Sequence, residues 1–292
     1  MAQSTQTDPR KPGILRAWDK LPVAVRAVVT GLFVFSVLQV GWNVLVVLNL
    51  EATPSIPWHL PAGLFYLWVG FRYFDGRWAP ASTSSRRRLA LRARRLSGTQ
   101  WRTALAACGA VTVFIIAFTM LNYRLIEVPQ EATDLSAYPW WTVYSMLIMV
   151  SITAGVSEEA GFRGYIQAPL EHRYGATVAI GLTATLFWLI HLNHPSGVAR
   201  WPSLLAMGIA LGALAYTARS ILPAMVTHAF ADSVVFVASQ AEVGPECLWS
   251  PPLLSEAGID VPLVGTVGVA GLAGVIAILA MRRLRRVTAH SA

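Results

Sequence analysis

The sequence predicts an all-α membrane protein: a polytopic membrane helix bundle of about eight transmembrane helices, with the N- and C-termini cytoplasmic. Three observations support this fold class. The 292 residues are 55% hydrophobic and only 13% charged, which is too little charge for the surface of a soluble protein. Apolar runs of about 20 residues, enough to cross a bilayer as a helix, recur along the chain. The basic residues gather at the ends of alternate runs.

The apolar runs predict the spans in order. A polar, basic tail over 1–26 precedes the first run, which is too long for a signal-peptide core and is expected to be retained. The second run is short and contains Pro61, so it is the weakest, with a re-entrant or tilted segment as the alternative. The fourth run is long enough for its end to protrude from the bilayer. The expected spans are 27–49, 57–73, 103–122, 140–168, 176–192, 203–219, 221–240 and 260–281.

The basic residues predict the orientation. Of the 23 Lys and Arg residues, only Arg124 and Arg200 fall in connections on the expected outer side, and Arg163 lies within a span. The others lie in the tail, the 72–102 connection, the later inner turns and the C-terminus, which are therefore expected to be cytoplasmic. We expect a multi-pass protein of the cell membrane, and the short, arginine-rich connections are typical of a bacterial one.

The net charge of +8 indicates an anionic partner. Nucleic acid is not expected, because the basic residues cluster at span ends rather than on a polar domain. Anionic lipid of the inner leaflet is the expected partner. The segment 84–96 is interpreted as a linker that fixes the topology, and the alternative is an amphipathic surface helix that recruits substrates or lipids.

The chain is expected to have four parts. The cytoplasmic tail (1–26) is followed by N-terminal helices with the basic linker (27–139). The segment 140–240 is the expected functional core, because ionisable side chains interrupt its apolar runs. The segment 241–292 holds an outer loop, the last helix and a basic cytoplasmic tail.

Two adjacent glutamates lie inside an apolar run, where a charged side chain costs about 2.5–3.5 kcal/mol at the bilayer centre. On an α-helix Glu159 and Arg163 share a face, so an ion pair between them is expected. Glu158 is rotated about 100° away and has no local partner. Glu158 is therefore the candidate general base or acid, and a structural ion pair with a spare glutamate is the alternative.

Two histidines in later runs are candidates for the same site. Glu158 and His191 lie about 16 residues on either side of a turn near Gly175, so antiparallel helices would bring them to one level. His228 and Asp232 are spaced i, i+4 and share a face. That spacing suits two metal ligands, or a carboxylate that orients an imidazole, and an interhelical polar clamp is the alternative.

Together these residues resemble the three signature motifs of the CAAX-protease and bacteriocin-processing (CPBP, or Abi) family of intramembrane endopeptidases. That family includes the type II CAAX prenyl endopeptidases. The motifs occur in the family's order, on separate expected spans within about 140–240. The resemblance rests on Glu158-Glu159-x-x-x-Arg163, then Phe187-x-x-x-His191, then His228-x-x-x-Asp232.

The resemblance implies a helical bundle with a cavity open toward the cytoplasm. It also implies hydrolysis of a peptide bond near the end of a membrane-anchored protein or peptide. The implied roles are activation of water by Glu158 and His191, stabilisation of the oxyanion by His228 and Asp232, and support by Glu159 and Arg163.

The implied cofactor is either none or one divalent metal ion, with zinc as the first choice. Position 232 is often asparagine in the family and is aspartate here. Asparagine donates hydrogen bonds to an oxyanion, whereas an ionised aspartate suits a metal ion. The metal ligands would then be Glu158, His191, His228 and Asp232.

Two other functions are alternatives to an endopeptidase. One is a non-catalytic bacteriocin-immunity or membrane scaffold protein, against which the intact ionisable residues of all three motifs weigh. The other is a proton-coupled transporter, because chains of carboxylates and histidines also serve as proton relays. A transporter predicts inverted repeats with broken helices, and the sequence contains no such symmetry.

Overall fold

The structure is a computed structural model that describes residues 13–129, 135–194, 196–241 and 251–289. These residues form helices and connections and contain no β-strand, which confirms the all-α fold class. Arg10 and Lys11 of the expected tail and residues 242–250 of the expected outer loop lie outside the described residues.

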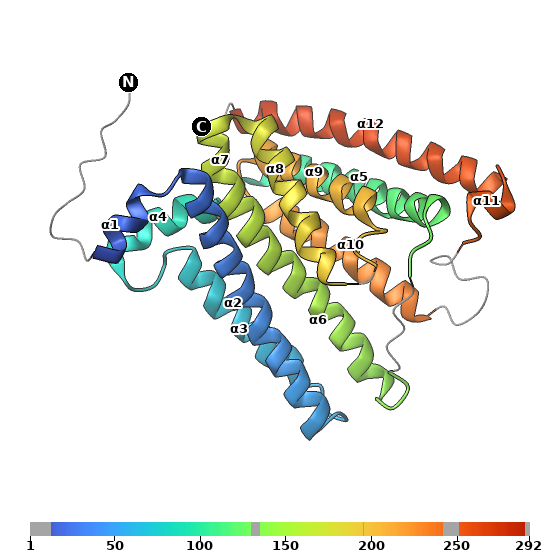
Figure 1. The fold of residues 1–292 in the computed structure, drawn as a ribbon, viewed down its shortest axis with the longest axis horizontal. Helices are drawn as coiled ribbons and strands as arrows, with labels where there is room; N and C mark the ends of the chain where they lie inside the picture. Colours follow the sequence, from blue (N-terminus) through green and yellow to red (C-terminus); the bar gives the residue numbers. More distant parts are fainter. Residues whose placement is uncertain (1–12, 130–134, 195, 242–250, 290–292) are drawn as a thin grey trace.

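The helices pack side by side into a bundle (Figure 1). A π-helical segment, η1 (Glu159–Gln167), joins α6 to α7, and a 3₁₀ turn, η2 (Ile190–Asn193), follows α8. The α-helices are α1 (Gly13–Lys20), α2 (Val23–Ala52), α3 (His59–Phe74), α4 (Ala81–Leu91), α5 (Gly98–Leu125), α6 (Trp140–Glu158), α7 (Ala168–Tyr174), α8 (Ala176–Leu189), α9 (Trp201–Ala218), α10 (Leu222–Ala241), α11 (Leu254–Ala257) and α12 (Val261–Ala289).

Six helical segments of the described chain are long and apolar enough to cross a membrane. They are Val23–Ala52, Gly98–Leu125, Trp140–Tyr174, Ala176–Asn193, Trp201–Ala218 and Val261–Ala289. The other two expected spans, 57–73 and 221–240, correspond to the 16-residue α3 and to α10, whose apolar stretch Leu222–Ala238 is shorter than those six. In the bundle α10 packs against α5, α6 and α9.

The basic linker folds onto the bundle instead of running free between spans. Within it, α4 packs against α3, η1 and α7, with Leu91 fully buried. The Arg87 guanidinium is also buried and donates hydrogen bonds to the carbonyls of Tyr73, Trp78 and Pro80. These three hydrogen bonds tie the connection after α3 to α4.

The two ends of the bundle differ in charge. In Figure 1, α1, α4, α7 and the end of α12 lie together at the upper left, and the basic linker and the Arg282–Arg286 region belong to this end. The α2–α3 turn, the start of α6 and α11 lie toward the other end. There Arg124, one of the two arginines expected outside, pairs with Asp260 at 2.6 Å.

Asp260 provides a pH-dependent contribution to stability at that end. The backbone N–H of Leu263, 2.8 Å away at the start of α12, and the Arg124 guanidinium lower the pKa of Asp260 below its ordinary value of 3.8. A lowered folded-state pKa contributes stability that is present above pH 3.8 and is lost as the pH falls through the folded-state value. Replacing Asp260 by alanine is expected to lower Tm by a few degrees at pH 7 and by nothing in strong acid. An equal loss at both pH values would contradict this.

Candidate active site

The two glutamates lie where α6 gives way to the π-helical segment η1. In a π-helix the backbone bonds run i→i+5, and such segments are frequent at functional sites. The expected α-helix over 140–168 was therefore wrong in this detail. Two glycines let neighbouring backbone approach η1 closely: a Cβ on Gly161 would lie 2.8 Å from the Gly31 carbonyl oxygen, and one on Gly164 would lie 2.9 Å from that of Leu91.

Glu159 is the centre of a fully buried ionic contact. Its Oε1 lies 2.8 Å from Nη1 of Arg163 and 2.8 Å from Nδ1 of His228. The expected Glu159–Arg163 pair is thus present, although its N–H is not aligned for a hydrogen bond. The sequence did not predict the second contact. Through it, one carboxylate balances Arg163 and fixes the orientation of the His228 ring.

His228 lies between carboxylates from two helices. With Nδ1 held by Glu159, its Nε2 faces Asp232 Oδ2 at 3.3 Å and Glu158 Oε2 at 3.8 Å. Both ring nitrogens face acceptors, so the imidazole is placed as a donor on both sides. Asp232 contacts His228, as the i, i+4 spacing predicted, but Glu159 is the closer orienting carboxylate.

One carboxylate oxygen of Glu158 makes no hydrogen bond to the described residues. This atom, Oε2, is buried. Its nearest charged neighbour is His228 Nε2 at 3.8 Å, beyond hydrogen-bond distance. This agrees with the expectation that Glu158 has no local partner and leaves it as a free acceptor beside a donor imidazole.

His191 is held in the 3₁₀ turn after α8. Its Nδ1 lies 2.7 Å from the carbonyl oxygen of Phe187. Because a carbonyl only accepts, Nδ1 must carry the proton, and we assign the lone pair to Nε2 on this basis. Gly197 allows this turn to pack, since a Cβ there would fall 1.8 Å from the His191 carbonyl oxygen. The sequence analysis did not single out Gly197. The signal that could have identified it is its position as a glycine in the loop after the histidine.

The Phe187 ring contacts both histidines and the arginine of the site. It is buried, with its centroid 4.8 Å from that of the His191 ring and 6.1 Å from that of the His228 ring. The Arg163 guanidinium lies over the same ring at 4.7 Å. The sequence had shown Phe187 only as part of a motif, and the structure makes it a common contact of both histidines and the arginine.

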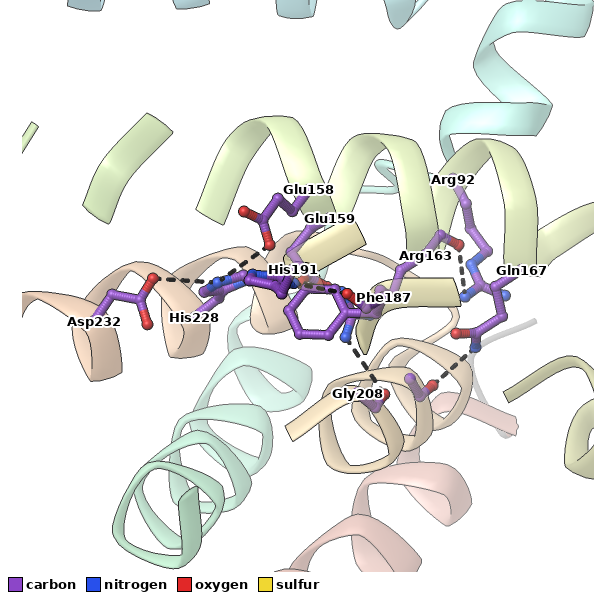
Figure 2. A network of polar contacts seen from close by, with 11 residues as sticks. Arg92, Glu158, Glu159, Arg163, Gln167, Phe187, His191, Gly208, His228 and Asp232 are labelled. Atoms are coloured by element: carbon purple, nitrogen blue, oxygen red, sulfur yellow. Dashed lines mark hydrogen bonds and ion pairs between the residues drawn. The ribbon is translucent and has the colours of Figure 1, made fainter. Parts of the chain in front are cut away.

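All six expected site residues converge in one cluster (Figure 2). They come from the α6–η1 helix, from η2 and from α10, three segments that are distant in the sequence. A further set of polar residues extends the network along η1: Gln167 donates to Glu171 at 2.7 Å and to the Gly212 carbonyl at 2.9 Å, and Arg92 binds Glu171 at 2.7 Å. The sequence interpretation had missed this extension, because Arg92 lies in the basic linker.

A metal ion at this cluster stays a prediction from the resemblance. Within the described ranges, no group of three or more His, Cys, Asp and Glu side chains is placed to hold one. Nδ1 of His228 faces Glu159 and Nδ1 of His191 faces a carbonyl, so Nε2 is the ring nitrogen of each that is left to face a ligand. The reaction proposed below uses no metal ion.

The fold and the cluster define the class of protein: an all-helical, multi-pass membrane protein with a buried carboxylate–imidazole site. Residues 139–234 match the family described as type II CAAX prenyl endopeptidase Rce1-like. This match confirms the resemblance drawn from the three motifs, and the matched segment holds all six site residues. Searches among curated proteins and among solved structures find no match to the chain.

Proposed function

We propose that the chain is an intramembrane endopeptidase of the CAAX prenyl endopeptidase type. It hydrolyses a peptide bond near the end of a membrane-anchored protein or peptide, in the cell membrane of a bacterium. The observation that carries the proposal is Glu158 Oε2, a buried acceptor that makes no hydrogen bond to the described residues and lies 3.8 Å from Nε2 of His228. His191, to whose Nε2 we assign the lone pair, belongs to the same cluster. This is the arrangement that glutamate-dependent hydrolysis needs.

In the proposed reaction, Glu158 takes a proton from water as the water oxygen bonds to the carbonyl carbon of the substrate. His191 accepts a second hydrogen bond from that water at Nε2 and so orients it. The carbonyl becomes an oxyanion, to which His228 donates from Nε2. The C–N bond then breaks, and Glu158 returns its proton to the leaving amine. The products are a carboxylate and an amine.

The remaining residues position these groups. Glu159 holds Nδ1 of His228, so that Nε2 faces the reacting carbonyl, and Arg163 balances the charge of Glu159. Asp232 lies 3.3 Å from His228 Nε2 and limits the rotation of the ring from the other side. Loss of such supporting contacts typically costs 10–100-fold at histidine sites of metalloenzymes, and we expect about the same order here.

The proposal is tested by hydrolysis in H₂¹⁸O. Purified full-length protein in lipid vesicles is incubated with a prenylated CAAX peptide, and the fragments are analysed by mass spectrometry. We expect cleavage after the prenylated cysteine, with one ¹⁸O in the new carboxylate. A chelator should leave the rate unchanged, because the proposed steps use no metal. Absence of product, as expected for a scaffold or a transporter, would overturn the proposal. Chelator inactivation reversed by zinc would overturn the metal-free mechanism.

A further inference from the structure

A cavity of about 620 Å³ opens at the basic end of the bundle, and none of the six expected site residues lines it. Its walls come from the connection after α3, from α4 with the residues that follow it, and from the turn between α9 and α10. Six arginines line it: Arg77, Arg88, Arg92, Arg94, Arg95 and Arg219. The only acidic side chain among its lining residues is that of Asp75.

The walls are joined by hydrogen bonds between segments distant in the sequence. The backbone N–H of Ile221 donates to the Arg92 carbonyl at 3.1 Å, and the Ser220 hydroxyl donates to the Arg94 carbonyl at 2.8 Å. The Arg94 side chain donates back to the Ala218 carbonyl at 3.2 Å. The cavity is therefore part of the fold rather than a gap beside a loose linker.

Two of the arginines occupy backbone positions that usually favour glycine. Arg92 ends α4 with φ +54°, and Arg219 ends α9 with φ +50°. Helices often end with a glycine in this left-handed conformation. At both positions the chain carries an arginine instead, and both side chains line the same cavity.

Positive charge is in excess in the cavity. Arg77 is paired with Asp75, and Arg92 with Glu171. Within the described residues, no carboxylate lies within ion-pair distance of Arg88, Arg94, Arg95 or Arg219. Guanidinium groups recognise phosphate oxygens through paired hydrogen bonds, so a phosphate group is the complementary ligand.

We propose that this cavity binds the phosphate headgroup of an anionic lipid. The cavity lies at the end of the bundle that holds α1, α4 and the basic end of α12, where a cytoplasmic leaflet would present such headgroups (Figure 1). Leu89 also lines the cavity and is 78% exposed, which provides an apolar contact for the upper part of an acyl chain. A free phosphate would use the arginines but not Leu89.

Three arginines allow the charge to be removed without breaking an identified bond. The side chains of Arg88, Arg95 and Arg219 are exposed, whereas those of Arg92 and Arg94 also bond to the bundle. The test variant is therefore Arg88→Gln/Arg95→Gln/Arg219→Gln. The matched control is Arg86→Gln/Arg282→Gln/Arg283→Gln, which removes the same charge from exposed arginines that do not line the cavity.

Binding is measured by native mass spectrometry of the full-length protein with cardiolipin, phosphatidylcholine and inorganic pyrophosphate as probes. We expect cardiolipin to bind more tightly than phosphatidylcholine, and the cavity variant to weaken cardiolipin binding at least about tenfold, since each basic residue near an anionic surface adds to the attraction. The control variant should bind like the wild type.

Equal losses in both variants would show general charge attraction and overturn the proposal. Tight pyrophosphate binding without selective cardiolipin binding would overturn the lipid assignment. Neither readout depends on proteolysis.

Discussion

Replacing Glu158 by glutamine is expected to reduce the rate of peptide hydrolysis about 10²–10⁴-fold, the usual contribution of a general base. Glutamine has the shape of glutamate but cannot take the proton of the attacking water. Because Oε2 of Glu158 makes no hydrogen bond to the described residues, the substitution breaks no protein hydrogen bond at that atom. The effect should therefore appear in kcat, with substrate binding and Tm close to those of the wild type.

A substitution at His191 tests the same proposed water activation. Replacing His191 by alanine removes the Nε2 acceptor and should also lower kcat by at least about 10²-fold. Because both residues act on the same water, the double variant should be little worse than the poorer single variant. Glu51→Gln, an exposed glutamate on α2, serves as the matched control and should keep full activity. Hydrolysis by Glu158→Gln at more than about a tenth of the wild-type rate would contradict the assignment.

The sequence predicted the cluster because its spacings are those of regular helices. Glu159 and Arg163 share a helix face, His228 and Asp232 share another, and equal rise on either side of Gly175 brings His191 level with Glu158. The structure places all six residues in one cluster. Local periodicity and helix rise are enough for predictions of this kind, because they depend on position within one or two adjacent elements.

The contacts between elements could not be predicted in the same way. The bond from Glu159 to His228 joins residues 69 positions apart, and the sequence pattern offered Asp232 as the nearer partner. The shared contact of Phe187 with two imidazoles and Arg163 depends on how three helices pack. The close approach of α2 and Leu91 to Gly161 and Gly164 in the π-helical segment likewise depends on packing between elements distant in the sequence.

Hydropathy alone could not determine the number of membrane spans. An apolar run predicts a helix, but it does not distinguish one that crosses the bilayer from one that completes the bundle. The 16-residue α3 and the apolar stretch Leu222–Ala238 of α10 are shorter than the other six. The orientation of the bundle stays a prediction from the distribution of Lys and Arg.

Replacing Arg163 by methionine is expected to destabilise the protein by about 3–5 kcal/mol, because it removes the guanidinium from a fully buried carboxylate and leaves Glu159 with His228 as its remaining partner. Arg163 and Glu159 are both fully buried, 2.8 Å apart, and no solvent can take over the role of the guanidinium. The loss would be measured as a fall in Tm, or in the free energy of unfolding in mixed detergent micelles. Arg92→Gln, which removes a part-buried arginine from the same network, should cost distinctly less.

A second substitution separates charge from packing in this pair. In Glu159→Gln/Arg163→Met the buried charges are removed together, so most of the stability lost in Arg163→Met should return. The glutamine amide oxygen can still accept from His228 Nδ1, but without the negative charge the ring is a weaker donor to an oxyanion. Hydrolysis should therefore stay about 10–100-fold below the wild type even where Tm recovers. If the double variant were as unstable as Arg163→Met, the loss would come from packing against Phe187, 4.7 Å from the guanidinium, and not from the unpaired carboxylate.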